Sequence, residues 1–396
     1  MKPAFYERKN AFLPYPEAPQ PSAPRGHLFG LSLAVKDLFD VAGYPTGAGN
    51  AVLLASSGVK LTSAPLVERL LAEGAHFVGK TFTDELAYSL VGHNLHFGSP
   101  INPRWPNLIV GGSSCGSAAA VAAGQADIGL GTDTSGSIRL PAACNGIIGW
   151  RPTYGLLSLA GCRALAPTFD TAGVLVHRLI DLERIMDACA VAEPQSDSPS
   201  HILIPSDLID LCEPSIRATF DRFVHHVGLN VSRVESMMEI AVAKRTYLYN
   251  SILWREAWCT NSTLFRQAGA SIDPQIRERL MRGHHIDVAS FEAAVAEREE
   301  LCDAFDRRFG ELNALFLFPT LPCEVPKRGS SATELSLFRE KAIGTLCGAG
   351  LLGLPQLTLP VGSTSDIHPF SVSLLGGRFA DRRLLQAAQS LFPGTA

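Results

Sequence analysis

Residues 111–155 read GGSSCGSAAAVAAGQADIGLGTDTSGSIRLPAACNGIIGWRPTYG, and this stretch is built mainly of Gly, Ser, Ala and Thr. Residues Ser117–Gly124 have the composition of a small-residue helix, and short apolar segments lie between the glycines that follow. Glycine costs conformational entropy wherever it is not required, and it marks places where one backbone comes close to another. The stretch therefore predicts tightly packed elements around a functional site.

Strand and helix patterns alternate on the N-terminal side of this stretch. Residues Leu31–Phe39 have a short apolar strand pattern that is interrupted by one lysine, Lys36. A helix is predicted for Ala64–Glu73, where apolar residues recur at helical spacing after a proline, and a strand is predicted for Ala75–Val78. A second helix is predicted around Asp84–Leu90. Such alternation favours an α/β sandwich.

The C-terminal half has a different character. Residues 205–310 are helical in pattern, more charged and richer in arginine, which predicts a more variable helical segment, either a cap or a semi-independent lobe. An apolar strand follows at Leu315–Phe318, closed by Pro319, and after it comes a C-terminal βαβ-like tail that ends in PFSVSLLGG. Residues 1–27 mix prolines, charges and aromatics and predict an irregular arm. We expect a single domain over residues 1–396.

The composition of the 396-residue chain excludes several classes of protein. Its net charge of −4 is spread without long runs of one sign, so no nucleic-acid partner is expected. No stretch reaches the roughly 18 apolar residues that span a bilayer. The N-terminus has no signal-peptide pattern, so we expect a cytoplasmic protein without membrane contact. The nine cysteines form no CxxC pair and the histidines have no ligand spacing, so neither a metal nor another cofactor is expected.

Two short motifs compete for the interpretation of the site. Gly74–Thr81 matches the P-loop pattern GxxxxGK[ST], but it follows a helix and has an apolar, strand-like interior, which inverts the context that nucleotide binding requires. Gly112–Gly116 matches the GxSxG nucleophile elbow of α/β-hydrolases, which needs a downstream acid and histidine. His225, His285 and His368 are available for that role, so a histidine-dependent hydrolase stays a remote alternative.

Taken as a whole, residues 111–155 resemble the signature of the amidase signature family of serine amidohydrolases, whose usual form has GGSSGGS, then GTDTGGSIRxPA, then G(L/F)(K/R)PT. Ala34–Asp37 (AVKD) is similar to the family's lysine segment. The resemblance extends from about Leu28 to the C-terminal GLLGLPQLTLPVG and PFSVSLLGG segments and is weakest between about 195 and 310. It implies a large, mixed, twisted β-sheet flanked on both sides by helices, and an enzyme that cleaves linear amides.

The resemblance also assigns a Ser–Ser–Lys triad. Ser137 matches the nucleophile, Ser113 matches the bridging serine, which follows a cis peptide bond in the family, and Lys36 matches the general base. Physical chemistry agrees with these roles, because a serine hydroxyl is a poor nucleophile until a base takes its proton. A lysine serves as that base only when burial favours its neutral form. Lys36 lies in an otherwise apolar strand, which suits the role.

Other residues receive roles from the same resemblance. One turn resembles an oxyanion hole, in which successive backbone amides stabilise the tetrahedral intermediate. The chain departs from the family pattern at Ser135 and Cys115, where glycine is commoner, and a serine at 135 would be strained if the turn required a positive φ there. The oxyanion residues are Thr134, Ser135, Gly136 and Ser137, and the supporting residues are Ser114, Asp133, Arg139 and the structural Asp170.

Several substrates fit this assignment. The segments VKDLFDV, DELAYS and TELSLFREKA look closest to indole-3-acetamide hydrolases, which favours a small arylacetamide as the substrate. Tyr88, Leu90 and Trp105 are candidate pocket residues, although large apolar side chains more often belong to a core. Three alternatives stay open: a small aliphatic or dicarboxylic half-amide whose carboxylate an arginine binds, the amidase subunit of a tRNA-dependent amidotransferase, and a non-catalytic binding protein. A homodimer is also open.

Overall fold

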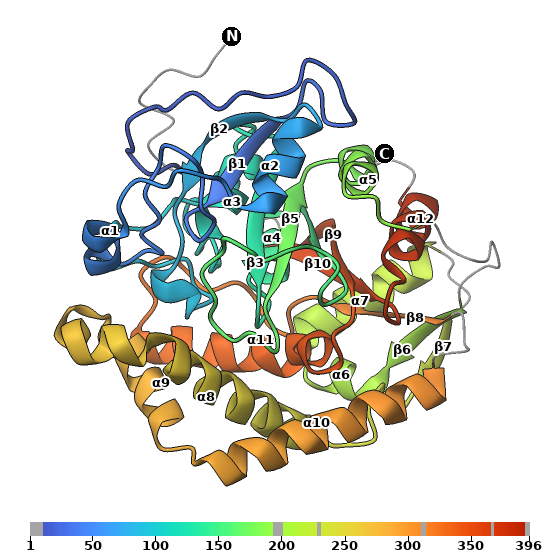
Figure 1. Cartoon of the computed structure of the whole chain (residues 1–396). Coiled ribbons are helices and arrows are strands. Elements are labelled where there is room, and N and C mark those ends of the chain that lie inside the picture. Colours follow the sequence, from blue (N-terminus) through green and yellow to red (C-terminus); the bar gives the residue numbers. More distant parts are fainter. Residues whose placement is uncertain (1–10, 193–200, 228–230, 310–313, 366–367, 393–396) are drawn as a thin grey trace.

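The computed structural model describes residues 11–192, 201–227, 231–309, 314–365 and 368–392 (Figure 1). Their strands form one sheet in the order β2-β1-β3-β5-β4-β9-β10-β8-β6-β7. The two edges of the sheet are parallel and its centre is antiparallel. The strands are β1 (Ser32–Lys36), β2 (His76–Thr81), β3 (Ile128–Asp133), β4 (Ile148–Arg151), β5 (Thr171–Val176), β6 (His201–Pro205), β7 (Val231–Val234), β8 (Ala314–Pro319), β9 (Gln356–Ser365) and β10 (His368–Leu375).

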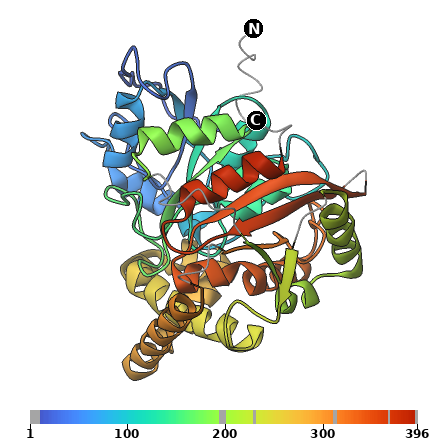
Figure 2. The ribbon, with the colours of Figure 1, turned by 90° about the vertical axis from the view of Figure 1, so that its right-hand side faces the viewer.

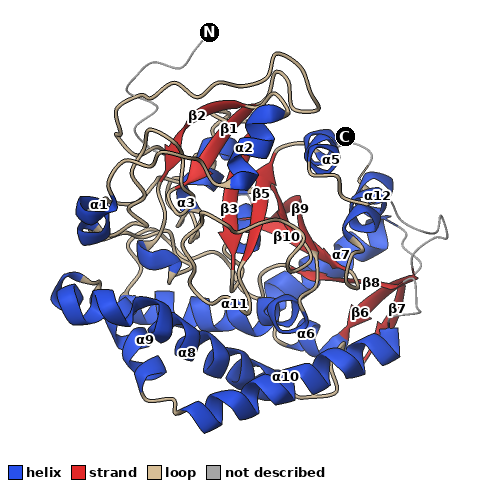
Figure 3. Ribbon diagram, viewed as in Figure 1, coloured by secondary structure: helices blue, strands red, loops and turns tan. Residues whose placement is uncertain are grey.

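Helices cover both faces of this sheet (Figure 3). The large mixed sheet flanked by helices, which the sequence predicts, is therefore confirmed. The helices are α1 (Ala51–Ser57), α2 (Pro65–Ala72), α3 (Cys115–Ala122), α4 (Arg139–Asn145), α5 (Leu179–Ala188), α6 (Ser206–Asp210), α7 (Pro214–Val227), α8 (Val242–Ala268), α9 (Pro274–His284), α10 (Val288–Phe309), α11 (Ala332–Leu352) and α12 (Asp381–Leu391), with short 3₁₀ turns at Glu85–Ala87 and Gly269–Ser271.

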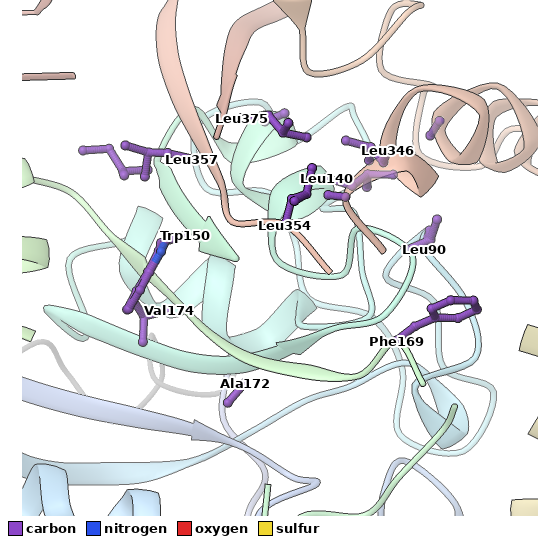
Figure 4. Packing of buried hydrophobic residues seen from close by; sticks show 14 of the residues in the cluster. Leu90, Leu140, Trp150, Phe169, Ala172, Val174, Leu346, Leu354, Leu357 and Leu375 are labelled. Carbon is purple, nitrogen blue, oxygen red and sulfur yellow. The ribbon is translucent and has the colours of Figure 1, made fainter. Parts of the chain in front are cut away.

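Successive residues of β4 face opposite sides of the sheet. Gly149 faces α4, where a Cβ would lie only 2.6 Å from the Cβ of Ala142, so glycine is required for this close approach. The next residue, Trp150, points to the opposite face, where its Nε1 donates to Asp381 of α12 at 3.0 Å. In Figure 4, Trp150 lies beside Val174 of β5 in the buried core. In Figure 2, α5 and α12 face the viewer on this second side.

The predicted helix at Ala64–Glu73 is confirmed as α2, but the helix predicted around Asp84–Leu90 is wrong. Only a 3₁₀ turn forms there, because Leu86 and Ala87 have left-handed φ values of 54° and 56°. The backbone amide of Asp84 donates to the carbonyl of Ser113 at 3.2 Å, so this segment is held by tertiary contacts rather than by its own helical pattern.

The predicted βαβ-like tail is also wrong. β9 and β10 pair antiparallel, and residues 366–367 alone separate them. A parallel pair needs a crossover of a dozen or more residues, so such a short connection permits only a hairpin. The helix of this region, α11, precedes both strands. It starts at a capping box formed by Ser331 and Glu334.

Residues 205–310 contribute β7 and the helices α6 to α10, and α8 packs against α9, α10 and α11. Figure 1 shows α8, α9 and α10 as an outer layer below the sheet, whereas α7 packs against β8 and β9. In the predicted arm, residues 1–10 lie outside the described part, and residues 11–27 contribute only an isolated bridge from Phe12 to Thr81. Within the described ranges, no helix is both long and apolar enough to cross a membrane.

Candidate active site

Lys36 is the last residue of β1, and its side chain is fully buried. Its Nζ lies 2.8 Å from the Ser113 hydroxyl, 3.1 Å from that of Ser114 and 2.9 Å from that of Thr132 at the end of β3. β1 and β3 are parallel neighbours, so their carboxyl ends meet at one edge of the sheet. Burial lowers the pKa of Lys36 to about 8, against an opposing effect of Asp84. The amine is therefore available as a base near neutral pH.

Ser113 follows a cis peptide bond from Gly112, as in the family pattern, and both Ser113 and Ser114 are fully buried. The backbone amide of Ser114 donates to the carbonyl of Ser137 at 3.3 Å, which joins the start of α3 to the turn before α4. The structure thus brings Lys36, Ser113 and Ser137 into one buried cluster. Among the described residues, the Ser137 hydroxyl has no hydrogen-bond partner.

Asp133 organises the turn that contains Ser137. Its carboxylate accepts hydrogen bonds from the backbone amides of Gly136 at 3.0 Å and Ile138 at 3.1 Å. It also accepts hydrogen bonds from the guanidinium of Arg139. Arg151 donates to the same carboxylate at 3.0 Å. Burial opposes ionisation of Asp133, but the two guanidinium groups outweigh it and hold its pKa below the usual value. Asp133 and Arg139 are therefore supporting residues that fix the turn.

The four residues predicted to form the oxyanion hole differ in whether their backbone amides are free to bind an oxyanion. The amide of Gly136 already donates to Asp133, whereas within the described chain the amides of Ser135 and Ser137 have no acceptor. The positive φ of the turn falls at Gly136, at 120°, and Ser135 is not among the described non-glycine residues with positive φ. The Ser135 hydroxyl bonds instead to that of Tyr249 at 2.8 Å. The serine that departs from the family pattern is thus accommodated without backbone strain.

Thr134 and Asp170 hold the other side of the turn. The Thr134 hydroxyl donates to the Asp170 carboxylate at 2.6 Å, and that carboxylate also accepts the amides of Leu165 and Ala166. Thr134, Asp170 and Thr132 line a mainly apolar cavity of about 150 Å³, and Thr132 is also a hydrogen-bond partner of Lys36.

We predict that Asp133→Asn strongly destabilises the protein. The substitution leaves the buried guanidinium groups of Arg139 and Arg151 without their shared carboxylate, and breaking a buried ion pair costs about 3–5 kcal/mol. Urea unfolding measures this change. Asp221→Asn is the matched control, because the ion pair of Asp221 with Arg233 is half exposed, and we expect it to alter the free energy of unfolding by less than about 1 kcal/mol. Equal effects from both variants would contradict the role of Asp133.

The predicted pocket residues lie apart from one another. Leu90 belongs to the hydrophobic core (Figure 4). Trp105 packs against the Arg104 guanidinium, 4.8 Å from the ring centroid. Tyr88 is buried and immediately follows Ala87, which lines the cavity. None of the three predicted residues lines that cavity, whose wall comes largely from residues 159–170. A single sequence gives little signal for this wall, because the loop contains no periodic pattern.

Sequence reasoning also missed Asp84. Its buried carboxylate accepts the amide of Gly92 at 3.2 Å and lies so close to Gly112 that a side chain there would collide with it. Burial raises the pKa of Asp84 to about 6, while the Gly92 amide and the Lys36 ammonium oppose that rise. Asp84 is therefore an acidic neighbour of the triad that favours the charged form of Lys36. The acidic pair Asp84–Glu85, just after β2, is the signal that could have drawn attention to it.

Neither of the two competing motifs forms the site that its pattern predicts. Lys80 of the P-loop match lies in β2, is buried, and pairs with Asp37 at 2.6 Å, so it is not free to bind a phosphate. In the GxSxG match, the Ser114 hydroxyl contacts Lys36 and Thr132, and no histidine within the described ranges bonds to Ser113, Ser114 or Ser137. The described residues also contain no cluster of three His, Cys, Asp or Glu side chains that could hold a metal.

Comparisons with known proteins identify the family of the chain. Residues 15–385 match the model of the Amidase family. The chain is 32% identical to Amidase 1 of Oryza sativa subsp. japonica, over 94% of this chain and 92% of that protein. It is 29% identical to a glutamyl-tRNA(Gln) amidotransferase subunit of Natronomonas pharaonis, over 92% of this chain and 96% of that one. A crystal structure of an amidase superposes with a TM-score of 0.83 at 28% identity and covers 99% of this chain and 93% of that chain. The chain therefore belongs to the amidase family and is a hydrolase that acts on amides.

Proposed function

We propose that the chain hydrolyses a small, primary carboxamide to a carboxylate and ammonia through a covalent acyl-enzyme. The observation that carries this proposal is the buried Lys36 amine, which contacts three hydroxyls and, in the described part of the chain, forms no ion pair with a carboxylate. Such an amine loses its proton more easily than an exposed one. It is thereby suited to activate a serine.

In the proposed reaction, neutral Lys36 accepts the proton of the Ser113 hydroxyl while Ser113 accepts that of Ser137. The Ser137 oxygen then attacks the amide carbon, and the carbonyl oxygen becomes an oxyanion that the free amides of Ser135 and Ser137 stabilise. The proton returns through Ser113 to the amide nitrogen as the C–N bond breaks, and ammonia leaves. Water repeats the sequence on the resulting ester and releases the acid.

The acyl group has two candidates. The apolar lining of the cavity beside Thr132 favours the small arylacetamide that the sequence predicts. A half-amide with a carboxylate at its far end is the second candidate, and buried arginines near Tyr88 favour it. The relatives named amidotransferase subunits raise a third case, in which the chain would act only in a complex. A cytoplasmic location and a homodimer stay predictions.

Ammonia release by the purified chain tests the proposed function. The chain alone should release ammonia from at least one amide in a panel of arylacetamides, aliphatic amides and half-amides. Hydroxylamine added to the reaction should divert the acyl-enzyme to a hydroxamate. No turnover of any amide would favour a binding protein, whereas turnover that begins only with a partner protein would favour the amidotransferase subunit.

We predict that kcat/KM rises with pH through about 8 and then levels off, because the neutral form of Lys36 is the active one and its pKa lies there. Below the pKa the rate should fall about tenfold per pH unit. Asp84→Asn removes a charge that favours the ammonium form, so its profile should shift to lower pH. A midpoint near 6.5 that does not move in Asp84→Asn would point to a histidine base instead.

A further inference from the structure

Two buried arginines near the candidate active site form no direct ion pair with any carboxylate of the described residues. Arg279 of α9 and Arg339 of α11 are each 9% exposed, and neither forms an ion pair with a carboxylate of the described residues. The Nε atom of each is buried without a hydrogen-bond partner. Arg279 donates one hydrogen bond, to the backbone carbonyl of Tyr88 at 2.9 Å, whereas Arg339 donates none to any described residue.

Other buried arginines of this chain are neutralised. Arg139 and Arg151 share Asp133, and Arg245 pairs with Asp207. Such pairing is the rule, because an isolated buried charge costs several kcal/mol. Arg279 and Arg339 break this rule together and also repel each other. Burial, reinforced by Arg339, lowers the pKa of Arg279 to about 10, a value at which it is still charged near neutral pH. Asp84 and Asp273 act on Arg279, and Glu340 acts on Arg339, only through longer-range attraction, and no carboxylate of the described residues contacts either guanidinium. Two neighbouring cations without a direct ion pair favour an anion that binds to both of them.

Tyr88 supplies a third donor to the same place. The Arg279 guanidinium lies 5.5 Å from the centroid of the Tyr88 ring, and the buried Tyr88 hydroxyl has no hydrogen-bond partner among the described residues. Burial raises the pKa of Tyr88 to about 12, so the hydroxyl keeps its proton. The Nε atoms of both arginines and the Tyr88 hydroxyl can donate and have no acceptor among the described residues, so they match a ligand that only accepts hydrogen bonds. A carboxylate has this property and fits a guanidinium in a bidentate geometry.

The cluster adjoins the catalytic turn. Tyr88 directly follows Ala87, which lines the cavity with Thr132 and Thr134. On α11, Leu346 packs against Gly136 of the turn, and Arg339 lies seven residues earlier, about 10 Å along the helix axis. Arg339 also interacts electrostatically with Tyr249, whose hydroxyl bonds to Ser135. The arginine cluster and the turn that contains Ser137 are therefore linked through α11 and Tyr249.

We propose that Arg279, Arg339 and the Tyr88 hydroxyl bind a carboxylate on the acyl part of the substrate. This inference rests on the proposed amide hydrolysis and selects the half-amide of a short dicarboxylic acid over the uncharged arylacetamide. The carboxylate neutralises the two cations, and its distance from the amide carbon determines which chain length places that carbon at Ser137. Binding of a free anion as an effector would use the same chemistry, so the experiment separates the two.

The test compares half-amides of four- to six-carbon dicarboxylic acids with uncharged amides of the same chain length. The wild-type enzyme should prefer one half-amide by at least about tenfold in kcat/KM. Arg339→Met and Arg279→Met should each lower kcat/KM for that half-amide by about 10–100-fold, mainly through KM, and leave the uncharged amide within about threefold. Arg277→Met is the matched control, because Arg277 is an exposed residue of the same helix as Arg279. This variant should leave kcat/KM unchanged for both the half-amide and the uncharged amide.

Two further measurements keep the outcomes distinct. The free dicarboxylate should compete with the half-amide, whereas non-competitive inhibition, or activation, would assign the site to a separate effector and overturn the proposal. Without ligand, Arg339→Met should raise the melting temperature, because it removes an unpaired buried charge. If Arg339→Met instead lowered the melting temperature and reduced kcat/KM equally for both substrates, Arg339 would have a structural role and the proposal would be overturned. Failure of the wild-type enzyme on every amide would instead contradict the proposed function, and turnover of uncharged amides alone would contradict only the carboxylate site.

Discussion

Ser137→Ala is expected to abolish amide hydrolysis, with a loss of kcat of at least about 10⁴-fold, because in the proposed mechanism the Ser137 oxygen forms the acyl-enzyme. The fold should be unaffected, since Ser137 holds its neighbours through its backbone carbonyl, which accepts the amide of Ser114, and alanine keeps that carbonyl. Ammonia release under single-turnover conditions measures the loss, and thermal unfolding checks the fold.

A sulfonyl fluoride reagent gives an independent measurement for the same variant. It should add one sulfonyl group to the wild-type chain, at Ser137 in a peptide map, and none to Ser137→Ala. Ser158→Ala serves as the control, because Ser158 is an exposed serine outside the signature stretch. If Ser137→Ala kept more than about one hundredth of the wild-type rate, Ser137 would not be the nucleophile.

Lys36→Met should be the second most damaging change, with a loss of about 10²–10⁴-fold in kcat, which is the usual contribution of a general base. Methionine has a similar length, and the removed amine leaves the hydroxyls of Ser113, Ser114 and Thr132 without their shared partner. The residual activity should no longer change with pH around 8, since that transition belongs to the Lys36 amine.

The control for this variant is Lys60→Met, because the Lys60 amine lies 3.6 Å from Asp40 in a partly exposed ion pair away from the triad. We expect its rate and pH profile to match those of the wild type. A Lys36→Met enzyme that kept the transition near 8 would assign that transition to another group and would remove Lys36 from the role of base.

The amino-acid sequence predicts the centre of this molecule much better than its periphery. The signature between Gly111 and Gly155 combines local turns with a fixed order of serines, and these features identify the family and the mixed sheet. The structure then brings Lys36, 77 residues before Ser113 in the chain, into hydrogen-bond contact with it. That contact follows from the parallel pairing of β1 with β3, which the alternation of strands and helices favours.

The sequence-based predictions are wrong or incomplete where tertiary contacts outweigh the local sequence pattern. The segment after Asp84 has helical spacing, yet Leu86 and Ala87 adopt left-handed backbone angles. The Arg279–Arg339 cluster joins side chains sixty positions apart on two different helices, and periodicity within either helix says nothing about the other. Asp84 itself gains its importance from burial beside Lys36, a property that the local sequence does not encode.

The glycine-lined face of the sheet has a consequence for how such an enzyme can change. At Gly131 and Gly149, added carbon atoms would run into Ser114 and Ala142, so natural variation or directed evolution has almost no freedom beneath the reacting serines. The atoms nearest to these added carbons belong to none of the helices α8, α9 and α11, which bear Tyr249, Arg279 and Arg339. New acyl preferences should therefore be acquired by exchanging side chains on these helices, while the chemistry beneath them stays the same.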